Sequence, residues 1–183
     1  VERLQHAGDW EALEGLMARA ARSLEAAGAE LIVLCTNTMH LCEKAIRQAV
    51  SVPFLHIASA TGKRIASRKL KTVGLLGTQF TMEKDFYKAV LHDTFGIQTC
   101  IPERREREAI HRIIYQELVL GQVREASREV FKEVIQGLVE RGAEGVILGC
   151  TEIPLLLSQA DVPVPVFDTT RIHAEEAVRW ALG

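Results

Sequence analysis

Residues 142–151 read Gly-Ala-Glu-Gly-Val-Ile-Leu-Gly-Cys-Thr, and residues 28–37 read Gly-Ala-Glu-Leu-Ile-Val-Leu-Cys-Thr-Asn. The two stretches lie 114 residues apart and share Gly-Ala-Glu, an apolar run and a polar end. A short continuous apolar run is typical of a strand buried on both faces of a parallel sheet. This internal repeat predicts two similar halves, each built around such a strand.

The neighbouring segments support the same interpretation. A helical pattern precedes each repeat, over residues 12–27 and 125–141, and a glycine follows each pattern where a helix C-cap is expected. Further strands are expected at 53–57, 72–76, 97–101 and 164–167, and further helices at 40–50, 82–95, 106–120, 153–157 and 171–182. This alternation predicts an α/β fold with two pseudo-symmetric, doubly wound parallel-sheet domains.

The repeat also predicts the domain boundaries. We expect residues 1–70 plus 169–183 to form the first α/β domain and residues 71–168 the second. The strand that opens the second half has its expected counterpart upstream of Val1. The first domain is therefore expected to lack its N-terminal βα unit.

Composition excludes several classes of function. The 183 residues carry a formal net charge of -2, with acidic and basic residues interspersed, which argues against nucleic-acid binding. No apolar run approaches the roughly 18 residues of a membrane span. The four cysteines lack the spacing of a metal site or a disulfide framework. We expect a cytoplasmic protein with reduced thiols and no bound metal.

Polar clusters follow three of the expected strands. They are Cys35-Thr36-Asn37-Thr38, Thr78-Gln79-Phe80-Thr81 and Cys150-Thr151-Glu152. Ligands of doubly wound sheets bind outside the carboxyl ends of the strands. If the two halves face each other, the first and third clusters meet over one cleft that suits a small ligand.

Cys150 has the features of a reactive thiol, because it follows a buried strand and precedes an expected helix whose amides favour a thiolate. The alternative is a buried cysteine that packs as a small hydrophobe. Asn37, Thr38 and Thr151 lie where free helix amides bind a carboxylate, although the same residue types also cap helices. His40 and His173 have no assigned role, and His111 is expected on a solvated helix face.

Three motifs resemble a known family. Asn37-Thr38-Met39-His40, residues 77–82 (Gly-Thr-Gln-Phe-Thr-Met) and residues 149–153 (Gly-Cys-Thr-Glu-Ile) are together similar to the aspartate/glutamate racemases. The resemblance implies an amino-acid racemase without pyridoxal phosphate or another cofactor, acting on aspartate or glutamate as a homodimer. It implies that Thr78 and Thr81 bind substrate with Asn37, Thr38 and Thr151.

One position departs from the family pattern. The family uses two cysteines, one on each face of the substrate α-carbon, but Thr36 occupies the place of the first. The internal repeat independently aligns Thr36 with Cys150. We therefore expect Cys150 to remove the α-proton of the L-isomer and Thr36 to act on the opposite face, with poor reaction from the D side.

Other functions stay open at this point. In the family the first strand contributes substrate contacts, so this chain without that strand could be inactive. The alternatives are a related decarboxylase or isomerase with a single cysteine, and a catalytically inactive fragment that binds a small molecule.

Overall fold

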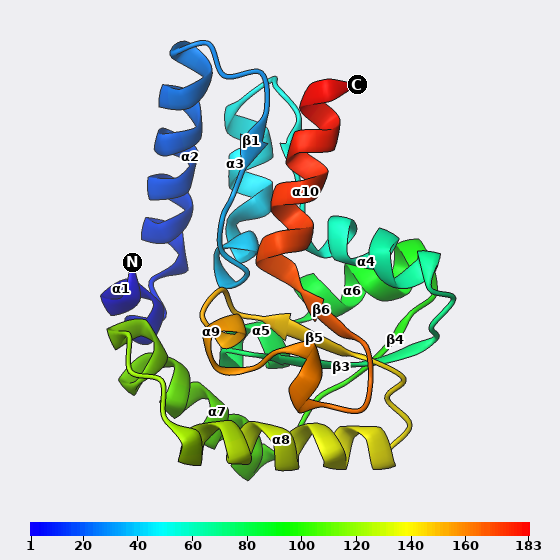
Figure 1. The fold of residues 1–183 in the computed structure, drawn as a ribbon. Coiled ribbons are helices and arrows are strands. Elements are labelled where there is room, and N and C mark those ends of the chain that lie inside the picture. Colours follow the sequence, from blue (N-terminus) through cyan, green and yellow to red (C-terminus); the bar gives the residue numbers. More distant parts are fainter. The chain divides into compact units, whose positions relative to one another are not determined.

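The structure, a computed structural model, describes residues 1–183 and divides into two compact units. The smaller unit contains Val1–Leu34 and Met39–His56, and the larger contains Cys35–Thr38 and Ile57–Gly183. Each unit contains parallel strands with helices packed on them, as Figure 1 shows. The predicted α/β fold class is confirmed.

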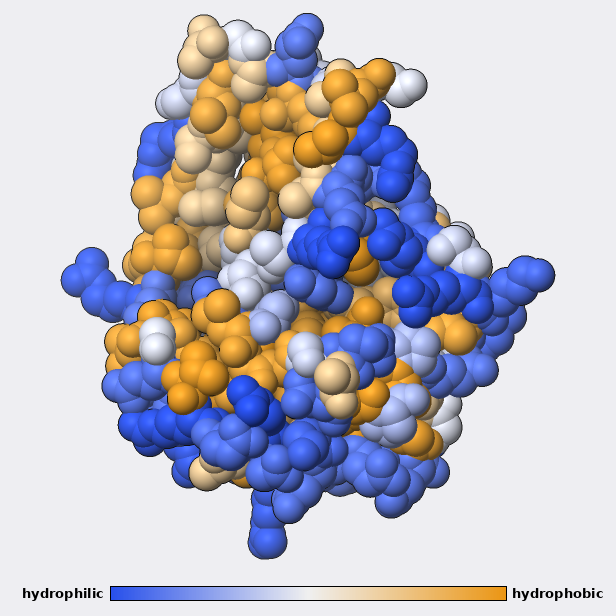
Figure 2. Space-filling model, in the orientation of Figure 1, coloured by the Kyte–Doolittle hydropathy of each residue, from blue (hydrophilic) through white to orange (hydrophobic).

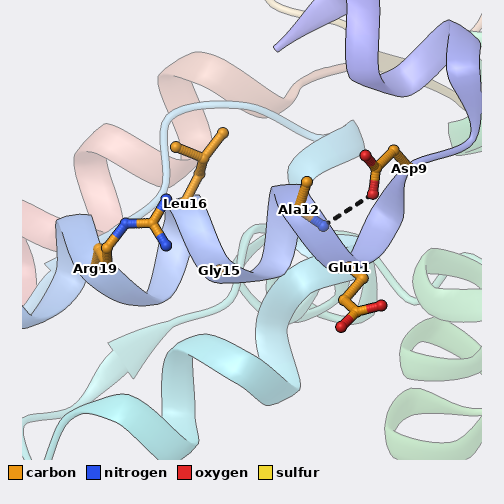
Figure 3. Close-up of a pocket in the computed structure, with 6 residues that line it drawn as sticks. All are labelled: Asp9, Glu11, Ala12, Gly15, Leu16 and Arg19. Carbon is orange, nitrogen blue, oxygen red and sulfur yellow. Dashed lines mark hydrogen bonds between the residues drawn. The ribbon is translucent and has the colours of Figure 1, made fainter.

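The smaller unit is built on two short parallel strands, β1 (Ile32–Val33) and β2 (Phe54–Leu55). Its other elements are α1 (Glu2–Ala7), α2 (Trp10–Ala26), most of the 3-10 helix η1 (Thr38–Cys42) and α3 (Glu43–Ala49). Asp9 caps the start of helix α2, since its carboxylate accepts the Ala12 N–H at 3.1 Å (Figure 3). The six residues drawn there line a pocket along the first turns of this helix: Asp9, Glu11, Ala12, Gly15, Leu16 and Arg19.

The larger unit is built on a four-stranded parallel sheet in the order β4-β3-β5-β6. The strands are β3 (Thr72–Gly77), β4 (Gln98–Cys100), β5 (Val146–Gly149) and β6 (Val166–Asp168). The chain goes from β3 outward to β4 and then returns across the sheet to β5. The order therefore reverses between β3 and β5, which is where ligands of such sheets bind.

Helices cover both faces of this sheet (Figure 1). Val73 and Leu75 of β3 pack with α4 (Ile57–Ser67), α6 (Asp85–Phe95) and α10 (Thr169–Leu182). Leu76 faces the other way, onto α5 (Gln79–Glu83), α7 (Arg104–Gln116), η2 (Leu118–Leu120), α8 (Glu125–Glu140) and α9 (Ile153–Leu156). The last short element is η3 (Gln159–Asp161). This alternation buries the central strands β3 and β5 on both faces, as their apolar runs predict.

The helices differ from the sequence-based expectations in two respects. Helix α4 was not among the predicted helices, and the predicted helix 82–95 divides into α5 and α6 at Lys84. In addition, α4 and α10 pack on the sheet of the larger unit, whereas the predicted boundaries assign residues 1–70 and 169–183 to the first domain. The predicted boundaries stay a prediction.

Apolar side chains remain exposed on the final turns of α10, where Val178 is 58% and Leu182 83% exposed. Figure 2 shows apolar surface at the end of this helix. None of the helices has the length and apolar character that crossing a membrane would require.

Candidate active site

The site is built where β3 and β5 end side by side. Gly77 pairs with Gly149 in the parallel register. A Cβ on Gly149 would lie 2.6 Å from the Leu76 carbonyl oxygen, and one on Gly77 would lie 2.7 Å from the Gly149 carbonyl oxygen. Only glycine permits this close approach. It brings the next residues, Thr78 and Cys150, to adjacent strand ends at the reversal of strand order.

Three threonine hydroxyls meet above these strand ends. The Oγ1 of Thr38 lies 2.9 Å from that of Thr78 and 3.2 Å from that of Thr81, and the latter two are 3.3 Å apart. All three residues are buried. Each hydroxyl has one rotatable proton, so the three donors can turn together toward an incoming acceptor such as a carboxylate.

Asn37 is held in one orientation by Thr169. The Thr169 hydroxyl donates to the Leu148 carbonyl at 2.8 Å, which uses its only proton. It can then only accept from Asn37, and Asn37 Nδ2 lies 3.0 Å away. The amide oxygen of Asn37 consequently points elsewhere, and it is buried without a hydrogen-bond partner. An orphaned buried acceptor of this kind suits a donor from a bound ligand.

Cys150 is a buried thiol with an acidic neighbour. Its side chain is 8% exposed, and Sγ donates to Oε2 of Glu152 at 2.8 Å. Burial raises the pKa of the Cys150 thiol well above its ordinary value, and the charge of Glu152 and the hydrogen bond to its carboxylate raise it further. The backbone N–H groups of Glu152 and Thr151 lower the pKa, but they are outweighed.

This balance is the opposite of the one expected from the sequence, which predicted helix amides that favour the thiolate. Helix α9 contains only four residues and begins at Ile153, so it supplies little of the expected dipole. The thiol is therefore neutral unless a nearby group takes its proton.

Two predicted site residues remain, Thr151 and Thr36, and each follows a strand. Thr151 is partly buried in the turn after β5, and Thr36 is partly buried in the segment between β1 and η1. Thr36 belongs to the larger unit with Asn37 and Thr38. Its role on the substrate face opposite Cys150 stays a prediction.

Sequence reasoning missed three side chains that contact the site. Thr169 resembles an ordinary polar helix start, and nothing in the sequence indicates its contact with Asn37. Glu152 was recognised only as part of a polar cluster. His111, expected on a solvated face of α7, is partly buried and accepts the Gln79 N–H at Nδ1, so that expectation is wrong.

Three other histidines, His40, His56 and His173, are buried. In the smaller unit, His40 packs against His56 with ring centroids 4.5 Å apart. In the larger unit, His173 is buried on α10. No group of three or more His, Cys, Asp or Glu side chains is arranged to hold a metal ion.

Comparisons with known proteins agree with these motifs. A family model described as Asp/Glu/Hydantoin racemase matches residues 1–177. The crystal structure of a candidate Asp/Glu racemase from Yersinia pestis is 48% identical, with a TM-score of 0.91, and the match covers 100% of this chain and 79% of that one. An aspartate racemase homologue from Pyrococcus horikoshii OT3 is 38% identical, with a TM-score of 0.84, covering 98% and 79% respectively.

Curated relatives lead to the same family. The broad specificity amino-acid racemase RacX of Bacillus subtilis (strain 168) is 28% identical over 170 residues, which are 89% of this chain and 70% of RacX. The chain spans about half the length of several curated glutamate racemases that it also matches. Because the family model covers nearly the whole sequence, the chain belongs to the Asp/Glu/hydantoin racemase family.

Proposed function

We propose that this protein is a cofactor-independent racemase of aspartate or glutamate. In this proposal Cys150 removes the α-proton of the L-isomer, and Thr36 acts on the opposite face of the α-carbon. Asn37, Thr38, Thr78, Thr81 and Thr151 bind the substrate. The names of the relatives, which include a broad specificity amino-acid racemase and an aspartate racemase homologue, support this substrate class.

The observation that carries the proposal is the orphaned oxygen of Asn37 beside the three threonine hydroxyls. An amino acid carries an ammonium donor and a carboxylate acceptor on the same carbon. Asn37 Oδ1 accepts from the ammonium, and the hydroxyls of Thr38, Thr78 and Thr81 donate to a carboxylate. Such a match satisfies the buried acceptor and leaves the α-carbon near the strand end that carries Cys150.

In the proposed mechanism, Glu152 is the base that converts the Cys150 thiol, whose pKa is high, into a thiolate. A thiolate of high pKa is a strong base for an α-proton, but little of it forms unaided. The Glu152 carboxylate, 2.8 Å from Sγ, accepts the thiol proton as substrate binds. The thiolate then takes the α-proton, and the electron pair of the broken C–H bond remains on the substrate carbanion.

The carbanion takes its new proton on the opposite face. The Thr36 hydroxyl supplies this proton and regains one from water, and the hydroxide left behind takes the proton that Glu152 holds, which restores the resting state. In the reverse direction Thr36 would have to remove a proton from the D-isomer, and a neutral hydroxyl is a far weaker base than a thiolate. The proposed enzyme is therefore one-sided, with fast proton removal from L-substrate and slow removal from D-substrate.

The cellular compartment and the oligomeric state are also part of the proposal. We expect a cytoplasmic enzyme that works as a homodimer, by resemblance to the family. Neither expectation is needed for the chemistry of Cys150.

The proposed activity is tested by incubating the protein with L-aspartate or L-glutamate and measuring the D-isomer by chiral chromatography. We expect D-isomer to form with the wild-type protein and to disappear with Cys150→Ala. The matched control is Cys100→Ala, on edge strand β4, which should leave the rate within about twofold of wild type. Equal loss in both variants would contradict a specific role for Cys150.

A further inference from the structure

Helix α5 is too short to be stable alone. It contains five residues, Gln79–Glu83, and isolated helices of this length do not persist in water. Its first backbone N–H groups have no partner within the helix. One of these, the N–H of Gln79, donates to Nδ1 of His111 on α7 at 3.2 Å.

A second contact secures the other end of α5. Arg107 Nε donates to Oε1 of Glu83 at 2.9 Å. Arg107 and His111 are one turn apart on α7, and Gln79 and Glu83 are the two ends of α5. Arg107 is itself anchored, because Nη1 donates to the Pro102 carbonyl at 2.7 Å. Helix α7 therefore holds α5 at both ends.

The ring of His111 is fixed in place. Its centroid lies 4.7 Å from that of Tyr115 and 6.0 Å from that of Phe80. Because Nδ1 accepts the Gln79 N–H, it carries no proton, and the neutral ring bears its hydrogen on Nε2. A ring held in this way gives α5 a defined position.

Helix α5 carries part of the proposed substrate site. Thr81 lies within it and Thr78 is its N-cap, and both hydroxyls contact Thr38. We propose that His111 is a positioning residue of the racemase, which sets the Thr78 and Thr81 hydroxyls for the substrate carboxylate through the Gln79 N–H. The inference takes its substrate from the proposed function. The way in which His111 acts is argued separately, from the contact between α5 and α7.

Two substitutions of His111 distinguish the contribution of its hydrogen bond from that of its ring packing. His111→Phe keeps an aromatic ring against Tyr115 but removes the acceptor. His111→Asn removes the ring but keeps an acceptor, Oδ1, the same number of bonds from the backbone as Nδ1. We expect His111→Phe to raise KM for L-aspartate or L-glutamate by roughly fivefold to tenfold with kcat within about twofold, and His111→Asn to restore KM to within about twofold of wild type.

His92→Phe is the matched control, since His92 is an exposed histidine on α6. It should leave KM and kcat unchanged. Melting temperatures of all three variants report whether folding is intact. If His111→Asn raises KM as much as His111→Phe, ring packing and not the hydrogen bond sets the site, and the inference fails.

Amide hydrogen exchange provides a readout that needs no substrate. The Gln79 amide should exchange faster in His111→Phe than in wild type and in His111→Asn. Unchanged exchange would overturn the contact itself, and faster exchange with unchanged KM would overturn its role in substrate binding. Absence of turnover in the wild-type protein would overturn the proposed function and the substrate part of this inference, while Gln79 exchange would still decide the contact.

Discussion

Cys150 and Glu152 form the smallest unit of the proposed chemistry, a buried thiol that donates to a carboxylate two residues along the chain. Burial disfavours the thiolate, and the carboxylate disfavours it further as a neighbouring charge. The same carboxylate is the nearest acceptor for the thiol proton. Glu152 therefore lowers the thiolate population at rest, and in the proposed mechanism it is also the base that creates the thiolate during turnover.

Glu152→Gln separates these two effects. It should lower the pKa of Cys150, because it removes a negative charge and a carboxylate acceptor, but the pKa should stay above the ordinary 9.0 because burial remains the largest cause. Turnover should nevertheless fall by roughly 10²-fold, because an amide cannot accept the thiol proton. Alkylation of the Cys150 peptide as a function of pH reports the pKa. A lower pKa accompanied by faster turnover would contradict the role of Glu152 as a base.

Thr169 is expected to matter for both binding and stability. Thr169→Val removes the acceptor of Asn37 Nδ2 and a donor to the Leu148 carbonyl in a fully buried place, which should lower the free energy of unfolding by about 1–3 kcal/mol. Asn37 is then free to turn, so KM should rise severalfold. Denaturant unfolding and steady-state kinetics measure the two effects.

The control for this substitution is the next residue. Thr170 is exposed, and Thr170→Val keeps the backbone N–H that donates to Asp168. It should change neither stability nor KM by a measurable amount. Similar losses in both variants would point to a general weakening of the α10 start and not to the orientation of Asn37.

At the residue scale, the sequence predicts which residues lie in the candidate site. It predicts much less well which of them form hydrogen bonds with one another. The strand-end threonines were predicted from their place after buried strands, and the structure brings Thr38, Thr78 and Thr81 within hydrogen-bond distance. The orientation of the Glu152 side chain could not be predicted, because it depends on a turn geometry that the sequence does not specify. The Thr169 contact joins residues 132 positions apart, beyond any local pattern.

Among the elements, α4 shows why one helix was missed. Its buried face is made largely of small residues, including Ala58, Ala60 and Gly62, and such a face gives a weak apolar periodicity. The small residues allow close packing on α6. A Cβ on Gly62 would lie only 2.4 Å from two atoms of the Phe95 ring.

Gly62→Ala should therefore destabilise the protein by about 1–3 kcal/mol through overpacking, although alanine is the better helix former. Gly137 of α8 provides the matched control, because the nearest atom to its Cβ is 3.9 Å away. Gly137→Ala should stabilise the protein by about 0.5–1 kcal/mol. Thermal unfolding of the two variants measures both. A stabilising Gly62→Ala would show that the Phe95 ring moves aside at little cost.

The strands were easier to predict than the helices around them. Buried parallel strands leave continuous apolar runs between turn residues, and β3 and β5 were located within one or two residues. The division between α5 and α6 was missed because Lys84, an ordinary helix former, adopts an extended conformation there. The contacts of His111 and Arg107 that hold α5 come from a distant helix and are not visible in the local sequence.

At the scale of the whole molecule, the family resemblance predicts a homodimer. Light scattering coupled to size-exclusion chromatography should give twice the 20.3 kDa mass of one chain. Apolar side chains such as Leu182, which is 83% exposed, are consistent with surface that is covered in an assembly. A mass of one chain across the concentrations used for kinetics would contradict the dimer and leave the proposed chemistry untouched.

The measurement that tests the central claim most directly is α-proton exchange in D2O, followed by NMR, with the L- and D-isomers of aspartate and glutamate. We predict deuterium incorporation into L-substrate that is lost in Cys150→Ala, with little incorporation into D-substrate at early times. Thr36→Ala should retain exchange into L-substrate while losing formation of the D-isomer. Equal exchange rates for the two isomers, or exchange into L-substrate that survives in Cys150→Ala, would contradict a one-sided racemase built on Cys150.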